Sequence, residues 1–275
     1  MGNLVWLASY PKSGSTWMRA FLHNYVRATD HPYDINSLTE LSTGESGATH
    51  YKRHDSRPAR DYAVADVQRM RPLVHRALTK LHPDLVFVKT HNASLVVEGV
   101  PLVTPDVTAG AIYMVRDPRD IAVSFSRHLG RSLDETIAFM ADPQAATGGT
   151  DQKVYERLGS WSVHVHFWTR NPNPRLLVLR YEDMIAAPEA AFGAVIRFLG
   201  EEPPEPRLAR AIRFSAFDEL RRQEQARGFV ERPAEAIGPF FRSGRPGAWR
   251  DVLTPHQQAC VERDHGALMD RFGYR

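Results

Sequence analysis

The sequence has almost no cysteine and no long apolar stretch. Cys260 is the only cysteine among 275 residues, so no disulfide can form within the chain, which favours a reducing compartment. We expect this thiol to be packed or at the surface. No run approaches the roughly 20 apolar residues of a membrane span, and the first residues lack the basic start of a secretory signal. We therefore expect a cytoplasmic protein with no membrane partner.

An excess of charge of either sign is also missing. Lys and Arg number 35 against 32 Asp and Glu, which gives a net charge of +3. This balance argues against a nucleic-acid partner and agrees with a local basic pocket for a small anion. Hydrophobic residues make up 43% of the chain, enough for a sizeable core, and the length favours one domain over residues 1–275.

Short, continuous apolar runs predict parallel strands that are buried on both faces. They are residues 4–8, 85–88, 111–115 and 176–179. Apolar residues at helical spacing predict helices between and after them, which are residues 154–169, 189–199 and 255–271. Asp117-Pro118 is typical of a helix start. The pattern predicts an α/β fold: a single domain with a central parallel sheet flanked by helices, similar to P-loop nucleotide-binding proteins.

A loop of small residues follows the first predicted strand and leads into a helix. It contains Lys12, Ser13, Gly14, Ser15 and Thr16, which offer a cation, hydroxyls and backbone N–H groups at a helix N-terminus. Such a place suits a phosphate. The lysine comes two residues before the glycine, whereas it follows the glycine in the ATPase loop G-x-x-x-x-G-K-[ST]. The difference points away from a kinase.

Polar residues follow the other predicted strands, where ligands of open α/β sheets bind. Lys89 and His91 are two residues apart, so they share one face of their strand. A neutral imidazole is suited to take a proton from a bound hydroxyl group, which makes His91 the candidate general base. Arg116 ends a strand and Ser124 lies about two turns into the next helix, so both can reach one phosphate.

Four separated segments together resemble the sulfotransferase family, whose members transfer a sulfonate group from 3′-phosphoadenosine-5′-phosphosulfate (PAPS). The segments are residues 10–17, 89–91, 113–124 and 240–249, with support from 180–184. The resemblance implies PAPS as donor, the bisphosphate PAP as product and no metal. The acceptor would be a hydroxyl of a small or medium organic molecule, such as a bacterial natural product. Substitutions around Pro255 put the family's usual dimer segment in doubt, so a monomer and a homodimer both stay open.

The resemblance also implies a role for individual residues. Lys12 would act on the leaving-group oxygen and Lys89 on the sulfonate oxygens, while Ser124 would restrain Lys12. The donor would be held by the loop of residues 12–17, by the pair Arg116 and Ser124 at its 3′-phosphate, by side chains that contact the adenine, and by a late segment. The residues implied are Lys12, Ser13, Gly14, Ser15, Thr16, Trp17, Arg116, Ser124, Tyr181, Ser215, Phe217, Phe240, Phe241, Arg242, Ser243 and Gly244.

Two other functions remain open at this point. A P-loop kinase-like phosphotransferase would need Mg²⁺ ligands, and the predicted strand ends offer mainly cations. A non-catalytic nucleotide-binding protein would have no need for both Lys12 and His91. Irregular segments that cover the site, around residues 30–72 and 225–248, are predicted to form the acceptor pocket together with 92–106 and 142–155.

Overall fold

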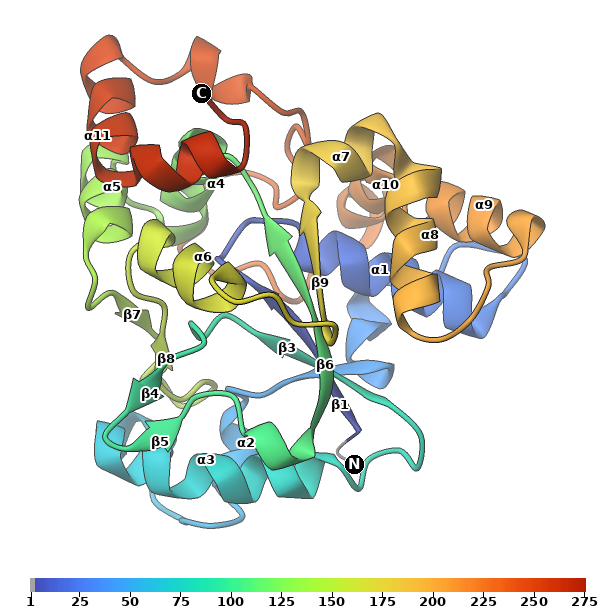
Figure 1. The fold of residues 1–275 in the computed structure, drawn as a ribbon, viewed down its shortest axis with the longest axis vertical. Helices are drawn as coiled ribbons and strands as arrows, with labels where there is room; N and C mark the ends of the chain where they lie inside the picture. The colour runs from blue at the N-terminus through green and yellow to red at the C-terminus, as the bar shows by residue number, and fades with distance from the viewer. Residues whose placement is uncertain (1–2) are drawn as a thin grey trace.

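The computed structural model describes residues 3–275 and has a sheet of five parallel strands at its centre (Figure 1). The strands are β1 (Leu4–Ser9), β2 (Ser42–Gly44), β3 (Val86–Thr90), β6 (Thr108–Val115) and β9 (Leu176–Arg180), in the order β2-β3-β1-β6-β9. β1 pairs with β3 on one side and β6 on the other. The carboxyl end of β1 therefore lies in the middle of the sheet edge where ligands bind.

Helices cover both faces of this sheet, with α1, α8 and α9 on one side and α4, α5, α6 and α11 on the other (Figure 1). The helices are α1 (Ser15–Arg27), α2 (Ala48–Tyr51), α3 (Val64–Leu78), α4 (Pro118–Leu129), α5 (Leu133–Ala141), α6 (Trp161–Thr169), α7 (Tyr181–Ala186), α8 (Pro188–Phe198), α9 (Glu205–Phe214), α10 (Phe217–Arg227) and α11 (Pro255–Arg271). Short 3-10 helices are η1 (Ile35–Glu40), η2 (Ala59–Asp61), η3 (Pro105–Val107) and η4 (Ala248–Asp251). Small hairpins pair β4 (Val96–Val97) with β5 (Val100–Pro101) and β7 (Ala146–Thr147) with β8 (Glu156–Arg157).

Alternate side chains of the strands pack into two separate hydrophobic cores. Leu4 and Trp6 of β1 pack in a cluster with residues of α3, α4, α6 and α11, whereas Val5 and Leu7 pack with α1, α8 and α9. Successive strand residues point to opposite faces, so a strand buried on both faces has to be apolar throughout. This is the reason that the apolar runs predicted the strands, and the predicted α/β fold is confirmed.

A buried carboxylate ties the edge strand to the strand beside it. Glu45, directly after β2, is fully buried and accepts a hydrogen bond of 2.7 Å from Arg71 Nη1 of α3. It also accepts hydrogen bonds from Thr90 and from the side-chain amide of Asn92. Burial works to raise the pKa of Glu45, but Arg71 and His75 outweigh it and lower the pKa to about 2. Because Thr90 and Asn92 flank His91, this network fixes the backbone at that strand end.

Two predictions about local structure are wrong. The helix predicted over residues 154–169 begins only at Trp161, because Ser160 caps it by accepting the Val163 N–H at 3.1 Å and residues 156 and 157 form β8. Residues 30–72 were expected to be irregular, yet they contain β2, η1, α2, η2 and the start of α3. β2 is three residues long and exists because it pairs with β3, which no local pattern reveals. Nowhere in residues 3–275 is there a helix of the length and apolar character needed to cross a bilayer.

Candidate active site

The loop between β1 and α1 folds into a cradle at the helix N-terminus. Lys12 has a left-handed backbone (φ 69°) and Gly14, the N-cap of α1, has φ 104°. A Cβ on Gly14 would lie 2.9 Å from the Tyr181 ring, so only glycine fits this close approach. Ser13 is fully buried, and its hydroxyl has no hydrogen-bond partner among the described residues. A strained backbone and an unpaired buried hydroxyl are typical of a ligand site.

Arg116 connects this cradle to two other parts of the chain. Its Nη1 donates to the Lys12 carbonyl at 3.1 Å, and its guanidinium lies 4.2 Å from the centroid of the Tyr181 ring. Tyr181 in turn donates its hydroxyl to the carbonyl of Gly244 at 2.8 Å. Gly244 belongs to residues 228–247, which form no helix or strand and are called the late loop below. The predicted phosphate loop, the end of β6, the end of β9 and the late segment therefore meet.

Two carboxylates hold the late loop in place through its backbone. Glu224 of α10 accepts hydrogen bonds from the N–H groups of Phe240 (2.6 Å) and Phe241 (2.8 Å). Asp120 of α4 accepts one from the Gly247 N–H at 2.7 Å. These two carboxylates bind backbone groups, so they fix the loop without using its side chains.

Arginines that have no acidic partner gather beside Lys12. No ion pair within residues 3–275 involves Arg116, Arg127 or Arg242. Burial lowers the pKa of Arg242, and the charges of Arg127 and Arg116 lower it further. Guanidinium groups crowded in this way are suited to a phosphate, which accepts their donors in pairs.

His91 is held in the tautomer that a general base requires. Its Nδ1 lies 2.8 Å from the Ser9 carbonyl, which can only accept, so Nδ1 carries the proton and Nε2 keeps a lone pair. His164 of α6 contacts the His91 carbonyl through Nε2 at 3.1 Å and so supports the backbone. Burial, followed by the charge of Lys89, lowers the pKa of His91 well below its usual 6.5. The imidazole is therefore neutral at pH 7.

The two lysines at this edge also titrate abnormally. Burial lowers the pKa of Lys12 to about 7, with further lowering by Arg116 and Lys89. Burial lowers the pKa of Lys89 as well, although nearby Glu231 opposes the change. Buried cations that are only partly neutralised favour an anion in the space between them.

Comparison with known proteins identifies the family. The family model of the sulfotransferase domain matches residues 3–273. The chain belongs to the sulfotransferase family. It is 24% identical over 279 residues to sulfotransferase 1 family member D1 of Mus musculus, covering 97% of this chain and 83% of that protein. It is 26% identical over 287 residues to cytosolic sulfotransferase 16 of Arabidopsis thaliana, covering 97% and 75%.

Solved structures agree on the fold of this sulfotransferase. Mouse sulfotransferase SULT7A1 complexed with PAP superimposes with a TM-score of 0.61 at 19% identity, covering 97% of this chain and 84% of that one. Retinol dehydratase in a complex with retinol and PAP gives a TM-score of 0.66 at 20% identity, covering 97% and 81%. The predicted family, its P-loop-like fold and sulfonate transfer as the class of reaction are confirmed.

The sulfotransferase structure brings most of the predicted site residues together, with one contact missing. Lys12, Ser124 and Arg242 line the same cavity. Within the described chain, however, no hydrogen bond joins Lys12 to Ser124, and Lys12 Nζ lies 3.6 Å from the centroid of the Phe240 ring. The cavity is about 20 Å³, roughly the space of one water molecule. Phe240 therefore lies over the lysine that is predicted to meet the donor.

The predicted adenine contacts cluster less completely. The Trp17 ring lies edge-on to Tyr181 with centroids 5.7 Å apart. Phe217 packs so closely on Gly244 that a Cβ there would lie 2.5 Å from its ring. Ser215 donates its hydroxyl to the Ala211 carbonyl at 2.8 Å, so it can only accept a further hydrogen bond. Trp17 and Phe217 are placed near the Tyr181–Gly244 contact, whereas the Ser215 proton is already used inside its own helix end.

Sequence reasoning missed two side chains of this cavity, Arg127 and His128, which line it together with Ser124. They lie three and four residues after Ser124 on α4, and that spacing places side chains on one helix face. This spacing was the available signal. Burial, followed by the charges of Lys12 and Lys89, lowers the pKa of His128 to about 3. His128 is therefore a second neutral histidine close to the lysines.

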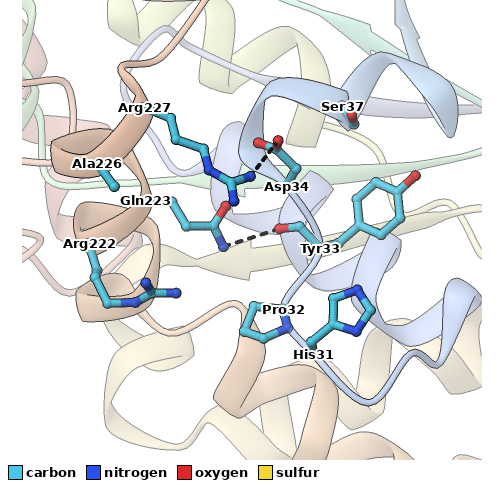
Figure 2. Close-up of a pocket in the computed structure, with 9 residues that line it drawn as sticks. All are labelled: His31, Pro32, Tyr33, Asp34, Ser37, Arg222, Gln223, Ala226 and Arg227. Carbon is cyan, nitrogen blue, oxygen red and sulfur yellow. Dashed lines mark hydrogen bonds and ion pairs between the residues drawn. The ribbon is translucent and has the colours of Figure 1, made fainter.

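A larger hollow elsewhere on the sulfotransferase shares none of these residues (Figure 2). Its volume is about 440 Å³, and its lining is His31, Pro32, Tyr33, Asp34, Ser37, Arg222, Gln223, Ala226 and Arg227. Its cations already have partners, since Arg227 lies 3.2 Å from Asp34 and Arg222 lies 2.7 Å from Glu219. This hollow lacks the unpaired positive charge of the site around Lys12.

Proposed function

We propose that this protein transfers a sulfonate group from PAPS to a hydroxyl of a small or medium organic acceptor. The observation that carries the proposal is the set of unpaired cations around Lys12 next to a histidine whose Nε2 is free to take a proton. Mouse sulfotransferase SULT7A1 and retinol dehydratase, which share this fold, were both solved in complexes with PAP. We also propose that the protein is cytoplasmic, that residues 1–275 form a single domain, and that the protein is a monomer or a homodimer.

In this proposal the donor is held by groups around Lys12, of which the Ser13 hydroxyl and Arg116 Nε have no hydrogen-bond partner among the described residues. The unpaired Ser13 hydroxyl and the N-terminal amides of α1 bind the 5′-phosphate, and the free Nε of Arg116 together with Ser124 and Arg242 binds the 3′-phosphate. Tyr181, Trp17 and Phe217 surround the adenine. The donor supplies an activated sulfonate, and the protein supplies charge, position and a base.

During transfer His91 Nε2 takes the hydroxyl proton while the acceptor oxygen bonds to sulfur and the bond from sulfur to the phosphate oxygen breaks. Lys12 stabilises the charge that grows on that leaving oxygen, and Lys89 stabilises the sulfonate oxygens. Both lysines have to be protonated for this role, which is why their lowered pKa values matter. PAP leaves with the electron pair of the broken bond, and no covalent enzyme intermediate forms.

The acceptor pocket is proposed to lie on the His91 side of the lysines. Contacts between two of the expected segments support this: the Ala48 N–H donates to the Gln152 carbonyl at 2.9 Å, and Gly47 bridges to Lys153. The solved relatives include complexes with retinol and with androsterone, both small molecules. Labelled transfer to a panel of phenols, alcohols and glycosylated natural products would identify the acceptor class.

Replacing Arg127 with alanine should weaken PAP binding by about tenfold, the typical effect of one charge-assisted hydrogen bond. The affinity for ADP should not change, because ADP lacks the 3′-phosphate. Isothermal titration calorimetry measures both. Arg131→Ala is the matched control, since it removes a charge just after the end of α4 and outside the cavity. Equal losses for PAP and ADP would show that Arg127 does not face the 3′-phosphate.

The titration of Lys12 should make PAP binding depend on pH. With a pKa of about 7 in the free protein, Lys12 is half neutral at pH 7, and a bound phosphate raises its pKa. Binding therefore takes up a proton, and affinity should fall by roughly tenfold as the pH rises from 7 to 8.5. Calorimetry at several pH values tests this. Lys12→Met should bind PAP more weakly with a flat profile, and a flat wild-type profile would contradict the role given to Lys12.

A further inference from the structure

Glu231 of the late loop reaches the end of β3 and touches Lys89. Its Oε2 lies 3.5 Å from Lys89 Nζ, and the two side chains are only 25% and 18% exposed. Its oxygens also accept hydrogen bonds of 2.7 and 2.9 Å from Arg19 Nη1. One carboxylate is therefore shared by two cations in a largely buried place.

Arg19 is a rigid support for this carboxylate. It lies on α1, is 3% exposed, and donates its Nε to the Ser42 hydroxyl of β2 at 2.8 Å. Ser42 is itself fixed, because its hydroxyl donates to the Leu38 carbonyl at 2.9 Å. Arg19 is thus held from one side by the sheet edge, and Glu231 links it to Lys89 on the other.

The charge of Lys89 depends on this contact. Burial lowers the pKa of Lys89, and Glu231 is the foremost group that opposes the change. Burial would raise the pKa of Glu231, but Lys89 and Arg19 outweigh it and lower the pKa to about 2, so the carboxylate stays charged at any working pH. The other titratable or charged groups around Lys89, from every neighbouring element, are Lys12, Arg19, His91, His128, Lys153 and Glu156. Glu156 is the one other acid among them and has a smaller effect on the pKa of Lys89, so Glu231 is the main counter-ion of this lysine.

We propose that Glu231 is a positioning residue for sulfonate transfer, which holds the Lys89 ammonium in place beside His91. This rests on the proposed function of Lys89. Glu231 stands on the same late loop as Arg242 and Gly244, which are proposed to cover the donor.

The variant Glu231→Gln tests the proposal, because it keeps the shape and removes the charge. We expect kcat to fall by about tenfold or more at pH 8, with PAP affinity unchanged, and the alkaline limb of kcat to move down by about one pH unit. Glu231→Asp keeps the charge on a shorter side chain and should show an intermediate shift. Glu235→Gln removes a charge from an exposed position of the same loop and should behave as wild type. An unchanged alkaline limb in folded Glu231→Gln would overturn the proposal.

A second measurement follows the protonation of the Lys89 amine and needs no transfer reaction. The rate at which acetic anhydride labels the Lys89 amine, followed by mass spectrometry across pH, gives its titration midpoint. The midpoint should be lower in Glu231→Gln than in the wild-type protein. It should be lower to a smaller extent in Glu231→Asp, which replaces the first variant in this test if that variant does not fold. Equal midpoints would overturn the coupling. A wild-type protein that transfers no sulfonate would instead contradict the proposed function, while the labelling would still decide whether Glu231 controls Lys89.

Discussion

Replacing His91 with alanine should lower kcat for sulfonate transfer by roughly 10²–10⁴-fold, the usual contribution of a general base. The Ser9 carbonyl fixes the proton on Nδ1, so Nε2 is the atom that accepts the hydroxyl proton. Steady-state transfer with saturating donor measures the loss. PAP affinity should stay the same, because the proposed phosphate contacts lie on the Lys12 and Arg116 side.

The pH dependence of the same reaction gives an independent check. Burial and Lys89 hold the pKa of His91 below its usual 6.5, so the base is already neutral at that pH and the acid limb of kcat should lie lower. His166→Ala is the matched control, since His166 is exposed on α6. Near-normal kcat in His91→Ala would mean that another base acts, and the neutral His128 would be the first to examine.

Replacing Glu45 with alanine should cost about 3–5 kcal/mol of folding free energy, because it leaves the buried Arg71 charge without a partner. Arg71 and Glu45 are both fully buried, with 2.7 Å between Nη1 and Oε2. For a chain of this size the midpoint of thermal unfolding should fall by roughly 10 °C. Differential scanning calorimetry and urea unfolding measure the change.

The pKa of Glu45 adds a pH signature to this prediction. Its folded pKa of about 2 is depressed below the ordinary value of about 4.3, so its stabilising effect is complete above that value and is lost as the pH falls toward 2. The variant should therefore differ from wild type most at neutral pH and least near pH 2. Glu202→Ala is the control, because its pair with Arg197 is mostly exposed and contributes at most about 1 kcal/mol. Equal effects of the two substitutions would contradict the role of the buried network.

Local sequence patterns predicted the parts of the fold that depend on local physics. The apolar runs predicted the central strands because both faces of these strands are covered, and Asp117-Pro118 predicted the start of α4, where Asp117 accepts the Arg119 N–H. β2 escaped prediction because three residues form a strand only through pairing with β3. The start of α6 was misplaced because Ser160 ends an extended segment that apolar spacing alone does not mark.

The residues of the candidate site also fall into those that local patterns predicted and those that depend on remote partners. Residues in the loop after β1 and at the ends of β3 and β6 were predictable, since parallel strands bring their carboxyl ends to one edge of the sheet. Glu231 and Glu45 were not, because each is defined by partners that are remote in sequence, such as Arg19 and Arg71. The spacing of Arg127 from Ser124 could have predicted its place on the same helix face, but not that its charge would be unpaired.

The central claim is that the cradle around Lys12 binds a nucleotide with a 3′-phosphate for sulfonate transfer, in contrast to a kinase, which binds a nucleotide diphosphate or triphosphate with Mg²⁺. Calorimetric titration with 3′,5′-adenosine bisphosphate and with ADP, in the same buffer with EDTA, tests this directly. The unpaired guanidinium groups of Arg116, Arg127 and Arg242 predict that the bisphosphate binds at least about a hundredfold more tightly. ADP binding as tightly as the bisphosphate, or only with Mg²⁺, would contradict the claim.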